Sequence, residues 1–424
     1  MQSETAGRWF RLDNAAKLYP TISKTARPSV YRLSVLLHET VDAPRLQTAL
    51  ERVCLRFPSF AVRLRRGLFW YYLEQQKGAP RVLTGAYAPC QYVHPRSNGG
   101  FLFRVLAQGR RISLEVFHSI SDGTGALVFL RTLTAEYLRL GGAEIPCEKG
   151  VLDIHAQPDP AEWEDAYLRY ANPQARPARH TQRAYHPPGR MEADGVVRVT
   201  NGTLSVAAVK QKSHALGVTV TEYLCAVLLE QLLQMQQMQG PRRLRPVRIN
   251  VPVNLRTLFA SRTLRNFTLF VTPGIDPTTG TYTLEQIARQ VHHYMAYHLA
   301  PQMINADMSR NVASERNPVL RCLPLFIKKW GIRLVFDTAG DRVYSTTLTN
   351  LGPVEMPEAM RPYVQRWEAV LGANTHNTCN VAVTSTGDAM TVHFARTTQA
   401  CIVERAFFTR LVRLGLHVQV DASN

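Results

Sequence analysis

The sequence contains no long apolar run, and this lack excludes the first class of protein. No unbroken hydrophobic stretch in its 424 residues approaches the ~20 residues that a membrane-spanning helix needs. The segment from Met1 to Arg11 carries Glu4 and lacks the basic start and apolar centre of a secretory signal. We therefore expect a soluble, cytoplasmic protein.

Cysteine is scarce and scattered. The chain has seven cysteines, an odd number, and no close pair has the spacing of zinc ligands. They are Cys54, Cys90, Cys147, Cys225, Cys322, Cys379 and Cys401. This pattern predicts isolated thiols in a reducing compartment.

Acidic residues are also in short supply. The chain has 32 Asp and Glu residues and 50 Lys and Arg residues. The resulting formal net charge of +18 attracts anionic partners. The candidates are nucleic acid, an anionic membrane face, an acidic carrier protein and a phosphate-bearing co-substrate. The arginines form only short clusters, and solvated surface arginines explain any one of them equally well. These clusters are Arg63, Arg65 and Arg66, and Arg242, Arg243, Arg245 and Arg248. Without a basic tail or a recognisable nucleic-acid-binding module, nucleic-acid binding ranks low.

The composition that remains is that of an ordinary globular protein, with 45% hydrophobic and 19% charged residues. A chain of this length exceeds what one hydrophobic core usually serves, so two domains are expected. We expect an N-terminal half over residues 1–150, a crossover over 151–195 and a C-terminal half over 196–424.

Periodicity predicts an α/β chain. Alternating apolar residues predict strands over 31–37, 60–64 and 68–73, a hairpin with arms 101–106 and 111–117, and later strands over 197–204 and 247–253. Helical spacing predicts helices from Asp42 to Pro58, over 126–140, through Tyr223 and Leu229, and after Thr283. Prolines interrupt the pattern between Gly141 and Gly195, where one short helix is expected over 163–170.

The C-terminal part echoes the N-terminal part. Strands over 380–384 and 390–394 flank Gly387, and a helix over 401–414 follows, in the order of the hairpin and helix that flank His118. Superposing the two copies places Arg396 at the position of His118. The echo suggests two related halves, of which only the first carries the histidine.

The segment from His118 to Gly123 brings a base, a carboxylate and a glycine to a strand-to-helix turn. Ile112, Leu114, Val116 and His118 share one strand face, so the imidazole emerges where the strand ends. A histidine near neutrality can take a proton from an alcohol or an amine. The alternatives are a structural histidine and an Asp122 that only caps the next helix. Gly123 and Gly125 are expected to permit a tight turn.

His118, Asp122 and Gly123 resemble the HxxxDG motif of the superfamily that contains chloramphenicol acetyltransferase, condensation domains, plant BAHD acyltransferases and alcohol acetyltransferases. Two further segments, one over 251–256 with 263–267 and one over 347–353, resemble regions of the condensation-like and alcohol acetyltransferase members, so the resemblance covers nearly the whole chain. It is closest to bacterial alcohol acetyltransferases or stand-alone condensation-like proteins. Phe117 replaces the first histidine of the condensation-domain motif, and no DFGWG segment is present, which argues against peptide condensation and plant-type enzymes.

The resemblance implies two chloramphenicol acetyltransferase-like halves in a pseudo-dimer, with a substrate tunnel between them. It implies that His118 deprotonates the acceptor, and that Asp122 pairs structurally with an arginine, here Arg256. We expect this pair to meet with bidentate geometry. Gly123 supports the same turn. Thr347, Thr349 and Asn254 are candidates for contact with the oxyanion or the substrate. Strand threonines are, however, common without any such role.

The expected activity is acyl transfer from acyl-CoA, or from a phosphopantetheine thioester on a carrier protein, to a small alcohol or amine. We expect no cofactor, no metal ion and a monomer. His292, His293 and His298 do not share one helix face, so they do not predict a metal site, and His376 and His393 are expected to be structural. The alternatives are a non-catalytic condensation-like binding scaffold and a carrier-protein-dependent condensation enzyme.

Overall fold

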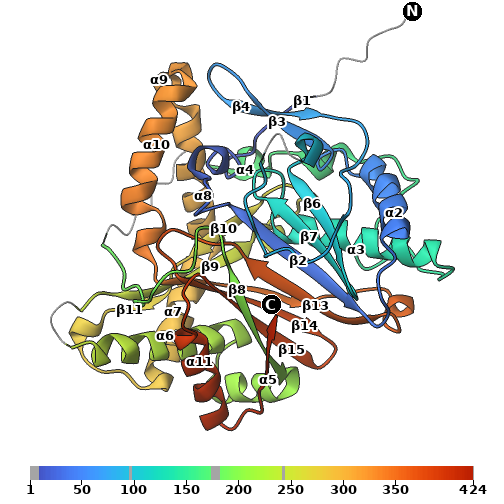
Figure 1. Cartoon of the computed structure of the whole chain (residues 1–424). Helices are drawn as coiled ribbons and strands as arrows, with labels where there is room; N and C mark the ends of the chain where they lie inside the picture. The colour runs from blue at the N-terminus through green and yellow to red at the C-terminus, as the bar shows by residue number, and fades with distance from the viewer. Residues whose placement is uncertain (1–8, 95–97, 173–181, 241–243, 424) are drawn as a thin grey trace, which may run out of the picture.

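A computed structural model describes residues 9–94, 98–172, 182–240 and 244–423. Within these ranges two large mixed sheets lie next to each other, and each carries helices on its outer side (Figure 1). The predicted α/β class is confirmed. Arg242, Arg243 and residues 173–181 of the expected crossover lie outside the described residues.

The first sheet contains the strands predicted around His118. Its order is β13-β2-β7-β6-β5, with β2 at Val30–Leu37, β5 at Leu83–Thr84, β6 at Phe103–Gln108, β7 at Arg111–Phe117 and β13 at Val364–Leu371. Helices α2 (Ala43–Arg56) and α3 (Gly123–Leu140) pack against each other on its outer side. The ring of Phe129 on α3 stacks on the ring of Phe60, with the ring centres 4.5 Å apart.

Strand β13 comes from the last part of the chain and yet completes this first sheet. It runs antiparallel to β2, with Trp367 opposite Val35, and the Trp367 side chain is fully buried. A strand from the predicted C-terminal half therefore lies in the sheet of the predicted N-terminal half. The division into 1–150, 151–195 and 196–424 stays a prediction.

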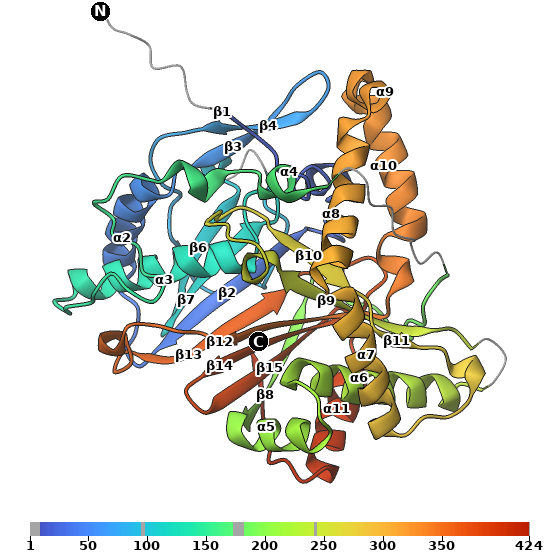
Figure 2. The ribbon, with the colours of Figure 1, turned by 180° about the vertical axis from the view of Figure 1, so that it is seen from behind.

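The second sheet has the order β10-β9-β12-β14-β15-β8-β16, and β11 pairs with β9. These strands are β8 Arg198–Ser205, β9 Val247–Asn254, β10 Thr268–Val271, β11 Gly274–Ile275, β12 Thr346–Pro353, β14 Cys379–Thr386, β15 Ala389–Arg396 and β16 Gln419–Ser423. Helices on its outer side are α5 Val206–Ala215, α6 Val220–Met238, α7 Leu284–His298 and α11 Ile402–Arg413 (Figure 2).

The predicted echo is visible in the order of the elements. Hairpin β6–β7 leads into α3, and hairpin β14–β15 leads into α11. Both hairpins turn on a glycine with positive φ, Gly109 at 56° and Gly387 at 58°, a conformation that glycine adopts readily. Arg396, the last residue of β15, pairs with Glu404 at 2.7 Å and so has a structural contact at this position.

A third group of elements stands beside the first sheet. It contains the small sheet of order β1-β4-β3 and a tall helical arm (Figures 1 and 2). The elements are β1 Trp9–Arg11, β3 Val62–Arg66, β4 Tyr71–Gln75, α8 Pro301–Arg316, α9 Pro318–Cys322 and α10 Leu325–Ala339. The strand predicted to begin at residue 68 starts at Tyr71, because Gly67 N donates to Trp70 O at 2.9 Å and closes a turn first.

Short helices complete the described part of the chain. They are α1 Tyr19–Ile22, α4 Ala166–Tyr170, η1 Asn98–Gly100, η2 Pro160–Trp163, η4 Leu255–Thr257, η5 Pro277–Thr279, η6 Asp341–Val343 and η7 Glu358–Met360. In the described ranges, no single helix has the length and apolarity to cross a membrane. Only α5 and α6 taken together pass that test, across a 78° bend, and the apolar side chains of α6 lie in the core of the second sheet.

Candidate active site

His118 follows the last residue of β7, at the boundary between the two sheets. Its backbone N donates to Ser29 O at 3.0 Å, which continues the pairing of β7 with the chain before β2. The imidazole stacks on Tyr19 with ring centres 4.8 Å apart, and Tyr31 lies on it at 4.6 Å. Tyr31 is itself held, because its hydroxyl donates to Ser121 O at 3.1 Å. The aromatic rings fix the plane in which the imidazole lies.

Asn266 defines which nitrogen of His118 carries the proton. Its Nδ2 donates to His118 O at 2.9 Å and to Asp13 Oδ2 at 3.2 Å. Its Oδ1 therefore faces His118 Nδ1, 3.4 Å away, and can only accept. This contact favours a proton on Nδ1 and leaves a lone pair on Nε2, which makes no hydrogen bond to the residues that the structure describes.

The pKa of His118 is lowered from its usual 6.5. Burial is the main cause, because it disfavours the charged imidazolium, while the contact with Asn266 and the charge of Asp122 oppose the shift. The imidazole is therefore neutral at pH 7 and able to accept a proton. Burial also raises the pKa of Asp13, against the nearby charge of Arg265.

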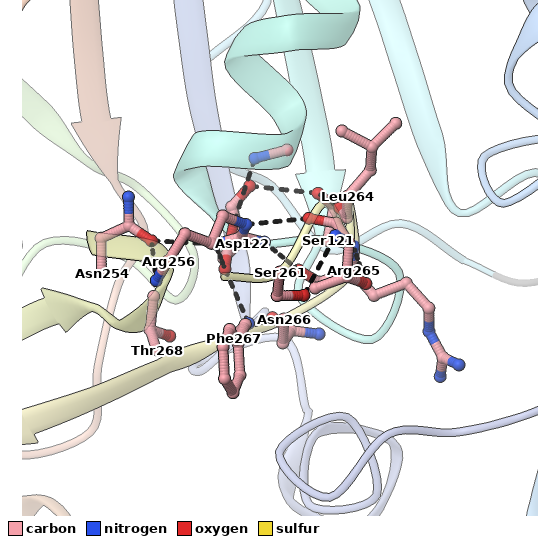
Figure 3. A network of polar contacts seen from close by, with 12 residues as sticks. Ser121, Asp122, Asn254, Arg256, Ser261, Leu264, Arg265, Asn266, Phe267 and Thr268 are labelled. Atoms are coloured by element: carbon pink, nitrogen blue, oxygen red, sulfur yellow. Dashed lines mark hydrogen bonds and ion pairs between the residues drawn. The ribbon is translucent and has the colours of Figure 1, made fainter. Parts of the chain in front are cut away.

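Asp122 is both a helix cap and the partner of an arginine (Figure 3). Its Oδ1 accepts from Gly125 N at 3.0 Å, which caps α3. Its Oδ2 accepts from Arg256 Nη1 at 2.9 Å and from Phe267 N at 2.8 Å. Asp122 as a whole residue is 1% exposed, so these contacts compensate for the burial of its carboxylate. The alternative of a cap alone is thus incomplete.

Arg256 contacts Asp122 through one nitrogen, so the bidentate geometry that we expected is wrong. Its other donors hold backbone carbonyls: Nε donates to Thr263 O at 2.8 Å and Nη2 to Arg265 O at 2.5 Å. The guanidinium thereby shapes the loop between Arg256 and Phe267. This loop carries Asn266 to His118, so the ion pair acts on the site through the backbone.

The glycines of the motif act through close packing, and our expectation of a tight turn is wrong. Gly123 and Gly125 both lie inside α3, which begins at Gly123 and not near residue 126 because Asp122 already caps it. A Cβ on Gly125 would lie 2.0 Å from Leu264 O and 2.4 Å from Ser121 Oγ. The absence of a side chain at Gly125 lets the 256–267 loop lie against the start of α3.

The C-terminal end of strand β12 lies next to the first residue of α3. A Cβ on Gly123 would lie 3.3 Å from Leu351 Cδ2. Thr347 and Thr349 precede Leu351 on this strand, and Thr347 Oγ1 accepts from Asn250 Nδ2 at 3.4 Å. Contact of either threonine with an oxyanion stays a prediction. The Oδ1 atom of Asn254 accepts hydrogen bonds from the backbone N and from Nη1 of Arg256, each at 3.1 Å. Only the side-chain NH₂ group of Asn254 could therefore donate to an oxyanion.

The other histidines considered in the sequence lie elsewhere. His393 is buried between Asn201 and Thr384, and burial lowers its pKa to about 4. His376 accepts from Arg342, His292 faces Glu222 at 3.2 Å, and His298 stacks on Tyr294. No group of three or more potential metal-binding side chains gathers in the described ranges.

Sequence reasoning missed the residues that surround His118. Tyr19 and Asp13 lie near the start of the chain, Tyr31 falls within a predicted strand, and Asn266 falls within one of the segments that carry the resemblance. Their separation from His118 in the sequence, up to 148 residues for Asn266, left no local pattern to detect. The Asn-Phe pair at 266–267 in the matched segment was the one available signal.

No protein-family model and no curated protein matches this sequence. Solved structures match over nearly the whole chain. Polyketide synthase associated protein 5 from Mycobacterium tuberculosis is 14% identical, with 98% of this chain and 99% of that chain covered and a TM-score of 0.63. TRI101 from F. graminearum, solved with coenzyme A and deoxynivalenol, is 11% identical, with 97% and 99% covered and a TM-score of 0.65.

The first condensation domain of the calcium-dependent antibiotic synthetase is also similar. It is 14% identical, each chain is covered over 96%, and the TM-score is 0.62. Identities this low show a shared fold. The fold is therefore that of condensation domains and chloramphenicol acetyltransferase-like acyltransferases, as the sequence motifs predicted.

Proposed function

We propose that this protein transfers an acyl group from a thioester to a hydroxyl or amine of a small acceptor, with His118 as the general base. The observation that carries the proposal is the state of His118. Its ring is neutral, Asn266 holds Nδ1, and Nε2 is left with its lone pair. A base prepared in this way can take a proton from an acceptor as the acceptor attacks.

The reaction balances without a further reactant. Nε2 takes the acceptor proton while the acceptor oxygen or nitrogen forms a bond to the thioester carbonyl carbon. When the tetrahedral intermediate collapses, the carbon–sulfur bond breaks, and the leaving thiolate takes the proton back from Nε2. The developing oxyanion needs a hydrogen-bond donor, for which we propose the hydroxyl of Thr347 or Thr349 on β12.

For the donor we propose acyl-CoA, or an acyl group on the phosphopantetheine of a carrier protein. The solved TRI101 structures contain coenzyme A, and the excess of basic residues in this chain would attract the phosphates of such a donor. We propose that the protein works as a monomer, without a cofactor or metal ion. The unpaired cysteines suit a reducing cytoplasm.

The test of this function is thiol release. The protein is incubated with acyl-CoAs of different chain length and with simple alcohols and amines, and free thiol is measured with and without acceptor. Acceptor-dependent release supports acyl transfer to that acceptor. Release only from an acylated carrier protein would favour the condensation alternative. No release from any donor would favour a non-catalytic binding scaffold.

The pH dependence of kcat/KM should show an acid limb centred below pH 6.5. The reason is that burial lowers the pKa of His118 from 6.5, and only the neutral imidazole can act as a base. Activity should therefore be lost as the pH falls through the lowered pKa and should be flat just above it. The measurement is initial rate at low substrate from acid to neutral pH. A limb centred clearly above pH 6.5 would contradict this assignment.

Replacing Asn266 with alanine should lower kcat by roughly tenfold to a hundredfold with little change in KM, because the imidazole loses the contact that orients it. Asn201 supplies a matched control, since its Oδ1 contacts His393 Nδ1 at 2.9 Å in the second sheet. Asn201→Ala should lower stability and leave kcat nearly unchanged. Equal losses of kcat in the two variants would show that Asn266 supports only folding.

A further inference from the structure

Two elements that are distant in the sequence present large apolar side chains to solvent at the same place. They are the turn between β3 and β4 and the helix α10, which stand side by side in both views (Figures 1 and 2). The exposed side chains are Leu68 (71%), Phe69 (42%), Phe326 (64%), Ile327 (42%), Trp330 (72%) and Leu334 (53%). We call this set the hairpin–α10 patch.

Specific contacts hold the two elements of the patch together. Leu325 N donates to Leu68 O at 2.8 Å, and Lys328 Nζ donates to Phe69 O at 3.1 Å. The same ammonium lies 3.8 Å from the centre of the Trp70 ring. The apolar surface is thus built into the fold. It does not depend on one loose side chain.

The exposed residues of α10 form a stripe. Phe326, Trp330 and Leu334 follow at intervals of four residues, and neighbours at this spacing lie on one face of a helix. The opposite side of α10 faces the protein, because Leu325 and Lys328 are buried there. Single exposed apolar residues are ordinary, but a gathered set of this size marks an interaction site.

Basic residues border the patch. They are Arg66 before the turn, Arg321 on α9, and Lys329 and Arg333 on α10. Arg65, also before the turn, is paired with Glu74 at 2.6 Å. The only acidic residue of α10 is Asp337, which lies 3.6 Å from Arg27. Aromatic and aliphatic side chains next to lysine and arginine are the composition of helices that lie in the interface of an anionic membrane.

We propose that the hairpin–α10 patch binds the surface of an anionic lipid membrane, with its apolar side chains at the level of the headgroups. A second copy of the chain fits less well, because a symmetric contact would bring the same basic border against itself. No helix needs to cross the bilayer for such binding. The proposal does not depend on acyl transfer, and its test uses no activity.

The test is co-sedimentation of the full chain with vesicles. One set is phosphatidylcholine alone, and the other is an equimolar mixture of phosphatidylcholine and phosphatidylglycerol. Wild type should pellet with the anionic vesicles and much less with the neutral ones. Phe326→Ser combined with Trp330→Ser should lower the partition coefficient roughly tenfold or more, since two large apolar side chains no longer enter the interface.

A matched control replaces two exposed apolar residues outside the patch with serine. Leu55 and Met238 are 77% and 80% exposed on α2 and α6, outside the patch. Leu55→Ser combined with Met238→Ser should bind anionic vesicles as wild type does. Thermal unfolding of both double variants checks that they fold. Arg66→Glu combined with Arg321→Glu should weaken binding to anionic vesicles by about tenfold, because it reverses charge at the border.

Three results would overturn the proposal. One is wild-type partitioning by the Phe326→Ser, Trp330→Ser variant. Another is failure of the folded wild type to pellet with anionic vesicles, including the case in which sedimentation velocity shows a dimer that this variant dissolves. The last is an equal loss of binding in the Leu55→Ser, Met238→Ser control, which would show that exposed apolar residues act without regard to position.

Discussion

Replacing His118 with alanine should leave a folded protein whose acyl transfer is reduced by roughly a hundredfold or more, the scale expected for loss of a positioned general base. The substitution removes the acceptor nitrogen Nε2 while the backbone contacts of residue 118, to Ser29 O and from Asn266 Nδ2, remain. Thiol release under saturating acceptor measures the effect. The same variant should lose the acid limb of the pH profile.

His293→Ala is the control for this substitution, because His293 is exposed on α7 and lies outside the site. It should have the turnover of wild type. Thermal unfolding should show that His118→Ala is folded at the assay temperature. Turnover close to that of wild type in the His118→Ala variant would remove the catalytic role and favour the binding scaffold.

Breaking the ion pair between Asp122 and Arg256 should have the second large effect. Both side chains are buried, at 2% and 12% exposed, so removing one partner leaves a charge without compensation. Asp122→Asn and Arg256→Ala should each cost on the order of 3 to 5 kcal/mol of stability. Each should also lower the rate, because the 256–267 loop that carries Asn266 loses its anchor. The double variant should lose much less than the sum.

Urea denaturation of the wild type, the two single variants and the double variant measures the coupling. The surface pair of Arg262 and Asp159 supplies the control: the nitrogen-to-oxygen distance is the same, 2.9 Å, but the side chains are 75% and 36% exposed. A double-mutant cycle on the Arg262–Asp159 pair should give a coupling free energy of only about 0 to 1 kcal/mol. If the losses of unfolding free energy in the Asp122 and Arg256 variants were additive, the two residues would have no coupling free energy. Asp122 would then act as a helix cap, worth about 1 kcal/mol.

Much of the local structure around the site could be predicted, because strand and helix periods are properties of neighbouring residues. The alternation ending at His118, the hairpin that precedes it and the cap at Asp122 all appear in the structure. The errors were also local in origin. Glycine suggested a turn after Asp122, whereas the helix simply starts there and the glycine makes room for another segment.

The contacts that complete the site could not be predicted in the same way. Nothing in the pattern of residues 30–37 indicates that β13, more than 300 residues later, pairs with this strand. The bidentate geometry expected for Arg256 failed because backbone carbonyls of Thr263 and Arg265 compete for its donors. Such competition depends on where a loop lies in three dimensions.

The sequence by itself determined the strands and helices next to His118 and singled out this histidine as the candidate base, because these follow from residue type and short-range spacing. Only the tertiary structure decided the surroundings of that histidine. Tyr19 and Asn266 reach His118 from opposite parts of the chain, and burial among them lowers the pKa of the imidazole. The chain must be folded before these groups meet, since desolvation and hydrogen-bond geometry arise only from packing.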